Sequence, residues 1–276
     1  MAIQHQAHRK GENFPVASWL VPQKARRAIV AFYDFARGAD NIADHASMES
    51  ADKEAALLAL KHALSEHYKN QMPPWAEEYY TVIYSGLLRP IHGEQLLEAF
   101  IQDTRKQRYR TFEELLAYCR LSAVPVGRAV LDACREDQAD IEASDAICIA
   151  LQLINHLQDI REDYAQLDRI YLPQEWLSQH QVAESDLAAF QASQGVRTVM
   201  DRVLEYVESQ LPLMDRLPKT IRSRRVRMEI LFIIQLIRAL VKALRRRDPM
   251  AEKVTLSTPH YIQCFICAVV RGPLWV

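Results

Sequence analysis

Residues 152–163 read QLINHLQDIRED, a helical stretch in which a polar stripe runs along an otherwise apolar surface. The members of the stripe are three, four and four residues apart, which keeps them on one face of a helix; they are Gln152, Asn155, Asp159 and Asp163. Two carboxylates one helical turn apart repel each other. The pattern therefore predicts that a positive group lies between them.

A second acidic pair lies far upstream, in residues 36–44, which read ARGADNIAD. Asp40 and Asp44 follow an apolar helical segment and are again one turn apart. One such pair alone is more simply a solvated helix face, but two pairs together favour a metal site. Mg²⁺ prefers oxygen ligands and bridges carboxylates to substrate phosphates. We expect the two segments to face each other across a helical bundle and to bind a diphosphate, with Arg37 contacting its oxygens.

Helical periodicity covers most of the chain, and no strand-like alternation of useful length occurs. Glycine is scarce, at 7 of 276 residues, and prolines fall mainly between the periodic segments. These features predict an all-α fold in which residues 1–276 form a single domain. The expected helices are 24–37, 51–68, 75–88, 92–107, 111–135, 142–166, 184–192, 196–216, 222–247 and 257–270.

Charge and hydropathy narrow the possible partners and location. The formal net charge of −1 is unlike that of proteins that bind nucleic acid. The N-terminus has no apolar leader, and no uncharged apolar run of 18 residues occurs. We expect a cytoplasmic protein, or one peripheral to the inner membrane through the apolar run 261–270. Cys264 and Cys267 lie in that run, where buried helix cysteines are the simplest interpretation.

The two acidic motifs resemble those of the squalene/phytoene synthase family, the head-to-head prenyl synthases of the all-α isoprenoid synthase fold. In that family, D-x-x-x-D and Q-x-x-N-x-x-x-D-x-x-x-D bind a Mg²⁺–diphosphate. The resemblance spans about residues 12–175 and includes RYRTFEEL at 108–115, Tyr118, and RIYLP at 169–173. It implies a helical bundle with a central apolar cavity.

The same resemblance implies a role for each matching residue. The implied metal ligands are Asp40, Asp44, Asn155, Asp159 and Asp163. The implied substrate contacts are Phe14, Arg37, Gln152 and Arg169. The four aspartates, Arg37 and Tyr118 are the implied catalytic residues, although a hydrogen-bonded core tyrosine is an equally good interpretation of Tyr118. His156 points away from the aspartate face and is expected to be structural.

Two stretches resemble the hydroxysqualene-forming branch of the family, which serves hopanoid biosynthesis. They are ENFPVAS at 12–18 and SAVPVGR at 122–128, where other members usually have A-G-x-V-G. Pro125 should kink its helix because proline has no N–H and clashes with the preceding turn. Glu12 stands where many members carry a Lys or His that binds a first allylic diphosphate. Its acidity suits an enzyme that starts from one diphosphate.

The resemblance therefore implies conversion of presqualene diphosphate and water to hydroxysqualene and diphosphate, with two or three Mg²⁺ ions and no NADPH. Other enzymes of hopanoid biosynthesis are the implied protein partners. One alternative is synthesis of presqualene diphosphate, squalene or phytoene by condensation of two prenyl diphosphates. Another is a non-catalytic helical lipid-binding or assembly factor. A di-iron bundle is excluded because the chain has no E-x-x-H pairs.

Overall fold

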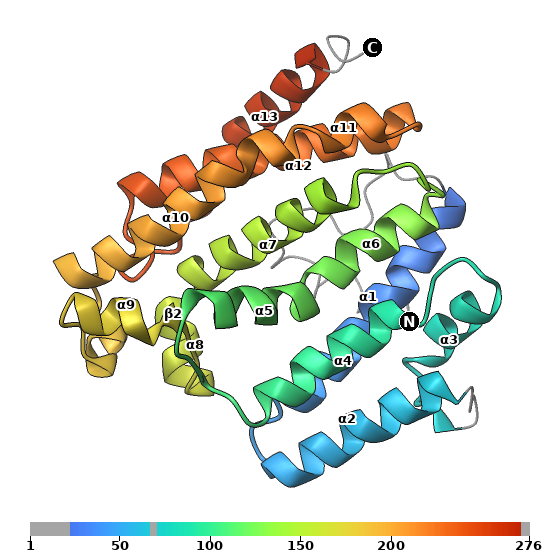
Figure 1. Cartoon of the computed structure of the whole chain (residues 1–276), viewed down its shortest axis with the longest axis horizontal. Coiled ribbons are helices and arrows are strands. Elements are labelled where there is room, and N and C mark those ends of the chain that lie inside the picture. Colours follow the sequence, from blue (N-terminus) through green and yellow to red (C-terminus); the bar gives the residue numbers. More distant parts are fainter. Residues whose placement is uncertain (1–22, 67–70, 272–276) are drawn as a thin grey trace.

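The computed structural model describes residues 23–66 and 71–271, except for the side chains of Lys24 and Arg271, and shows the expected all-α architecture (Figure 1). The α-helices are α1 (Gln23–Ala43), α2 (Ser50–Ser65), α3 (Glu77–Tyr84), α4 (Ile91–Asp103), α5 (Phe112–Ser122), α6 (Val124–Ala133), α7 (Ile141–Gln158), α8 (Ile160–Leu167), α9 (Gln174–Gln179), α10 (Gln194–Met214), α11 (Leu217–Thr220), α12 (Arg224–Arg246) and α13 (Thr258–Arg271).

Helix α5 begins after Thr111, whose side chain caps its first turn. The Thr111 hydroxyl accepts a hydrogen bond from the backbone N–H of Glu114 at 3.2 Å. The Glu114 carboxylate in turn accepts from the backbone N–H of Arg110 at 2.8 Å. This reciprocal pairing satisfies donors that the first helical turn leaves open. The arrangement is a capping box in which the carboxylate reaches one residue further back than in the standard form.

The predicted helix 111–135 is two helices, because the chain breaks at Ala123. Ala123 leaves the regular helical conformation, and Pro125 falls in the first turn of α6, where its missing N–H costs least. The N–H of Val126 donates to the carbonyl of Ala123 at 3.0 Å and so tightens this turn. The expected kink is therefore a complete interruption between α5 and α6.

The predicted helix 142–166 is also divided, at Asp159, between α7 and α8. The predicted helix 184–192 is a short 3₁₀ helix, η3 (Glu184–Ala188). A two-stranded parallel sheet was not predicted: β1 (Arg108–Tyr109) pairs with β2 (Ile170–Pro173). Strands of two and four residues are too short to show alternation, and all four residues of β2 are buried.

Two apolar cores hold the helices together. One is formed mainly by α1 to α4 and the other mainly by α5, α7, α10 and α12. Helix α6 contributes to both, since Ala129 and Ala133 pack in the first and Leu131 in the second. Figure 1 shows α5, α6 and α7 between the α1–α4 group and the α10–α12 pair. Helix α7 is thus buried on several sides.

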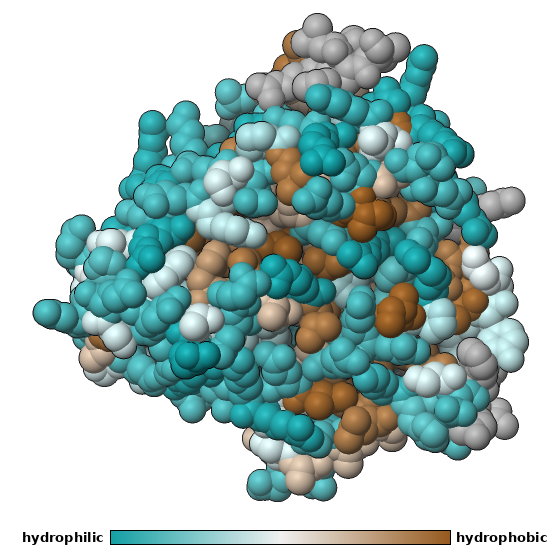
Figure 2. Space-filling view, in the orientation of Figure 1, coloured by the Kyte–Doolittle hydropathy of each residue, from teal (hydrophilic) through white to brown (hydrophobic). Residues whose placement is uncertain are grey.

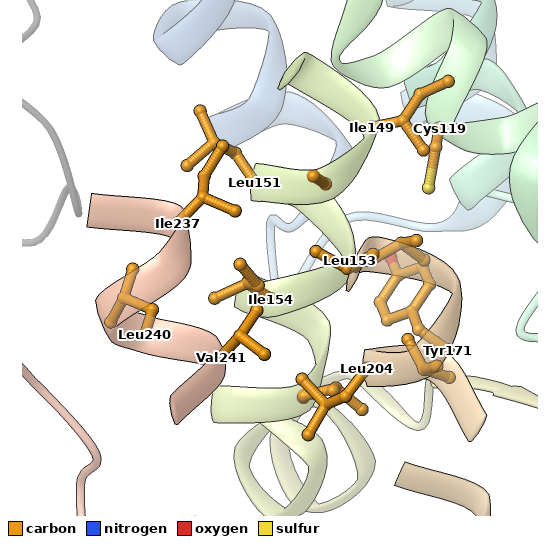
Figure 3. Packing of buried hydrophobic residues seen from close by; sticks show 14 of the residues in the cluster. Cys119, Ile149, Leu151, Leu153, Ile154, Tyr171, Leu204, Ile237, Leu240 and Val241 are labelled. Carbon is orange, nitrogen blue, oxygen red and sulfur yellow. The ribbon is translucent and has the colours of Figure 1, made fainter. Parts of the chain in front are cut away.

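The apolar face of α7 explains why it anchors the bundle. Figure 3 shows Leu151 and Ile154 of α7 facing Ile237 of α12, with Leu153 on the side of Tyr171. Leu153 and Ile154 are essentially inaccessible to solvent. Complete burial of such side chains stabilises the fold by about 1.5–3 kcal/mol each. The polar stripe of α7 is therefore held on a rigid support.

Candidate active site

A cavity of about 230 Å³ lies between α1, α4, α6 and α7. Most of its wall is apolar, and four polar residues from the two predicted motifs gather in it. Arg37 and Asp40 come from α1, and Gln152 and Asn155 from α7. The apolar wall includes Ile29, Phe32, Leu96, Phe100, Val126, Val130 and Leu151. The predicted central apolar cavity is confirmed, and it brings together segments distant in sequence.

Arg37 lies one turn before Asp40 and pairs with it. Its Nη1 atom is 2.8 Å from Oδ2 of Asp40, and the arginine side chain is half exposed. The guanidinium therefore keeps donors available while its charge offsets that of the carboxylate. An arginine in this position can bind an anion at the mouth of the cavity.

The second motif keeps its shared face despite the break at Asp159. The backbone N–H of Asp159 donates to the carbonyl of Asn155 at 3.0 Å. The backbone N–H of Asp163 donates to the carbonyl of Asp159 at 2.8 Å. Helical hydrogen bonding thus continues through the junction. Burial, and then the charge of Asp159, raise the pKa of Asp163 to about 8. Burial, and then the charge of Glu162, raise the pKa of Asp159.

Arg169 connects the two motifs. Its Nη1 atom lies 2.7 Å from Oδ1 of Asp44, and its backbone N–H donates to the carbonyl of Asp163 at 3.1 Å. The Arg169 side chain is only 8% exposed, and Asp44 contributes to the raised pKa of Asp163. The structure therefore brings the end of α1 and the start of α8 into one electrostatic cluster.

Tyr118 lies in a buried aromatic cluster rather than in the wall of the cavity. Its hydroxyl donates to Oδ2 of Asp103 at 2.8 Å, and its ring stacks on Tyr171. The imidazole of His156 also stacks on Tyr171, with the two ring centroids 3.8 Å apart. Burial, and then the charge of Arg169, lower the pKa of His156 to about 3, so it is neutral. This agrees with a structural role for His156.

Asp103 is the functional candidate that sequence reasoning missed. It is 5% exposed, and its Oδ1 atom has no hydrogen-bond partner in the described part of the chain. Burial raises its pKa to about 7, although the nearby charge of Arg169 acts in the opposite direction. The signal was present, because Leu96, Phe100 and Asp103 follow one another along the buried face of α4. An acid on an apolar stripe indicates a specific partner.

Asp103→Asn should reduce the dependence of stability on pH when no divalent cation is present. Because folding raises the pKa of Asp103, its contribution is greatest below its ordinary pKa of 3.8 and is lost as pH rises through about 7. We expect the melting temperature to fall less between pH 5 and pH 8 in the variant. Calorimetric melting of both proteins tests this, and parallel pH curves would contradict it.

The side chains of the two motifs supply oxygen donors of the kind that a hydrated divalent cation takes. Within residues 23–66 and 71–271, no group of three His, Cys, Asp or Glu side chains is close enough to hold a metal ion alone. Asp40 and Asp44 are instead paired with Arg37 and Arg169. Mg²⁺ typically takes one or two carboxylates, several waters and substrate phosphates. The donor set, all carboxylate and amide oxygens, suits that mode.

The structure brings most of the predicted residues into one region, in two groups. Arg37, Asp40, Gln152 and Asn155 line the cavity, whereas Asp44, Asp159, Asp163 and Arg169 form the adjoining cluster. Phe14 lies outside the described residues. No helix in the described part of the chain is long and apolar enough to cross a membrane.

Comparison with known proteins agrees with this geometry. Residues 7–260 match the model of the squalene/phytoene synthase family. The chain is 37% identical to the hydroxysqualene synthase of Zymomonas mobilis subsp. mobilis, over 88% of this chain and 82% of that protein. It is also 37% identical to the hydroxysqualene synthase of Sinorhizobium fredii, over 91% of this chain and 85% of that protein. The crystal structure of squalene synthase HpnC from Alicyclobacillus acidocaldarius superposes with a TM-score of 0.75 and 32% identity, covering 88% of this chain and 91% of that one.

Proposed function

Because this chain belongs to the squalene/phytoene synthase family, we propose that it converts presqualene diphosphate and water to hydroxysqualene and diphosphate. The observation that carries the proposal is the single cavity in which both acidic motifs place polar side chains against an apolar wall. The hydroxysqualene synthases that it resembles support this choice among the reactions of the family.

The polar end of the cavity suits the diphosphate. Arg37 can donate to its oxygens, while Gln152 and Asn155 offer amide groups from the facing helix. Asp40, Asp44, Asn155, Asp159 and Asp163 would hold two or three Mg²⁺ ions. When bound, these ions would stabilise the negative charge that develops on the departing diphosphate. Arg169 keeps Asp44 oriented in this cluster through their ion pair.

The apolar wall suits the isoprenoid chains and the cation that forms when the diphosphate leaves. Phe32, Phe100 and Leu151 exclude water from the region in which the cyclopropylcarbinyl cation rearranges. The face of an aromatic ring also attracts a cation. Delayed access of water determines the product, because early capture would give a different alcohol.

Incubation of the purified protein with presqualene diphosphate and Mg²⁺, without NADPH, tests the proposal. We expect hydroxysqualene and one diphosphate per molecule consumed. Parallel incubations with farnesyl diphosphate, with and without NADPH, test condensation and reduction. No turnover of presqualene diphosphate, or squalene formed only with NADPH, would overturn the proposal. The proposed product would pass to the hydroxysqualene-consuming step of hopanoid biosynthesis.

We also propose that the protein is cytoplasmic and attaches peripherally to the inner membrane, with α13 as the contact. This helix buries Cys264 and Ala268, and it exposes more than 40% of each side chain on its outer face: Ile262, Ile266, Val269 and Val270. Figure 2 shows that most of the surrounding surface in that view is hydrophilic. An exposed apolar helix face favours the boundary between lipid headgroups and acyl chains.

Ile266→Asp should weaken attachment to anionic phospholipid vesicles by about tenfold or more, because a charge replaces apolar contact area. Co-sedimentation measures the bound fraction. The matched control is Leu58→Asp, since Leu58 is 46% exposed on α2, at the opposite end of the molecule from α13 (Figure 1). Equal binding of the two variants would exclude α13 as the contact.

A further inference from the structure

The junction between α5 and α6 places a polar interruption in the wall of the cavity. Ser122 is the last residue of α5, and Ala123 separates it from α6. Pro125 has no N–H to donate to the carbonyl of Leu121, so the continuous helical ladder is lost here. Both Ser122 and Ala123 line the cavity. A hydroxyl-bearing residue therefore lies in the cavity wall at the point where the helix is broken.

The Ser122 hydroxyl is unpaired. Its Oγ atom is shielded from solvent and has no hydrogen-bond partner in the described part of the chain. A buried hydroxyl without a partner costs about 1–3 kcal/mol. Among the residues that line the cavity, its neighbours include Ala123, Val126 and Ala129, whose side chains offer no hydrogen bond. A buried hydroxyl without a partner needs an explanation, and a hydrogen bond to a water molecule that takes part in the reaction is one.

The position of Ser122 along the cavity follows from the packing of α6 on α7, which run in opposite directions (Figure 1). Gly127 of α6 lies against Cys148 of α7 so closely that an added Cβ would be 2.4 Å from its Sγ atom. Ser122 precedes Gly127 in the sequence, across the break at Ala123. In an antiparallel pair, a step toward the N-terminus of α6 leads along α7 from Cys148 toward Gln152. Ser122 lines the same cavity as Gln152 and Asn155, so it lies on the side of the polar residues of α7.

We propose that Ser122 holds the water molecule that captures the rearranged cation, an inference that rests on the proposed function. The C–O bond to the diphosphate breaks, and the diphosphate leaves with the electron pair. After rearrangement, the oxygen of the held water forms a new C–O bond, and the resulting oxonium group loses one proton to the released diphosphate. Ser122 exchanges hydrogen bonds with the water and is unchanged at the end.

Ser122→Ala tests this assignment through the ratio of hydroxysqualene formed to diphosphate released. In the wild-type protein we expect a ratio near one. In the alanine variant we expect the ratio to fall by about tenfold. The missing product should appear as isomeric alcohols or as hydrocarbons formed by proton loss from the cation. Ser122→Thr keeps the hydroxyl and should restore most of the ratio.

Two controls separate this proposal from effects on folding and from the proposed function. Ser122→Ala should melt at or above the wild-type temperature, because it removes an unpaired buried hydroxyl. Val126→Ala enlarges the same wall without removing the hydroxyl. A fall in the ratio as large as that in Ser122→Ala would show that the shape of the cavity, not the hydroxyl, determines the product, and would overturn the proposal. An unchanged ratio in Ser122→Ala, even with slower diphosphate release, would overturn the role in water capture. A wild-type protein that makes no hydroxysqualene would instead refute the proposed function.

Discussion

Replacing Asp159 by Asn should lower turnover of presqualene diphosphate by about three orders of magnitude while leaving the helical content unchanged. The change removes one charge but keeps nearly the same shape. Electrostatic stabilisation of a leaving group commonly accounts for factors of about 10²–10³ per interaction, and loss of a metal ligand adds to this. Because burial and Glu162 raise the pKa of Asp159, its neutralisation should not lower the melting temperature.

Glu162→Gln is the matched control for Asp159→Asn. Glu162 carries the same charge three residues further along the chain, but its side chain is exposed. Its replacement should change turnover by no more than a few fold. Steady-state assays of both variants, with circular dichroism for folding, make the comparison. An Asp159→Asn protein with the wild-type rate would contradict the metal assignment.

Replacing Arg169 by Gln should destabilise the protein by about 3 kcal/mol and also impair turnover. The Arg169 side chain is 8% exposed and pairs with Asp44. Its charge also opposes the raised pKa of buried Asp103. Removing one partner of a buried pair leaves the other charge uncompensated, which typically costs about 3–5 kcal/mol. The partial exposure of Asp44 places the expected value at the lower end.

Arg108→Gln provides the comparison for Arg169→Gln. Arg108 belongs to the adjoining strand β1 and pairs with Asp168 and Glu184, whose side chains are 77% and 44% exposed. Exposed pairs contribute about 1 kcal/mol or less. Urea unfolding at neutral pH should therefore show a clearly larger loss of unfolding free energy for Arg169→Gln than for Arg108→Gln. Equal losses of stability would show that Arg169 does not balance a buried acidic cluster.

The fold was largely predictable because helical periodicity and scarce glycine are properties of long segments. The points at which long helices are interrupted were harder to predict. Asp159 retains helical hydrogen bonds on both sides, so nothing in its local pattern marks the end of α7. Pro125 did mark its break, since its chemistry acts locally. The strand β2 is stabilised by pairing with a segment about 60 residues away, which no local pattern reveals.

The site was predictable where its residues repeat at helical spacing and less so elsewhere. Asp40 and Asn155 were identified because each belongs to a periodic motif, and the structure places both in the cavity. The hydrogen bond from Tyr118 to Asp103 depends on how α4 packs on α5, and Tyr118 is not among the residues that line the cavity. The unpaired hydroxyl of Ser122 likewise becomes visible only with its surroundings.

The most direct test of the central claim is a double-mutant cycle on Mg²⁺-dependent binding of inorganic diphosphate, measured by calorimetry. The cycle compares the wild type, Asp40→Asn, Asp159→Asn and the double variant. If both motifs hold shared ions, each single change should weaken binding by at least about tenfold, and the double variant should lose less than the sum, with a coupling of about 1 kcal/mol or more. Losses that add within about 0.5 kcal/mol, or a single variant with wild-type affinity, would contradict it.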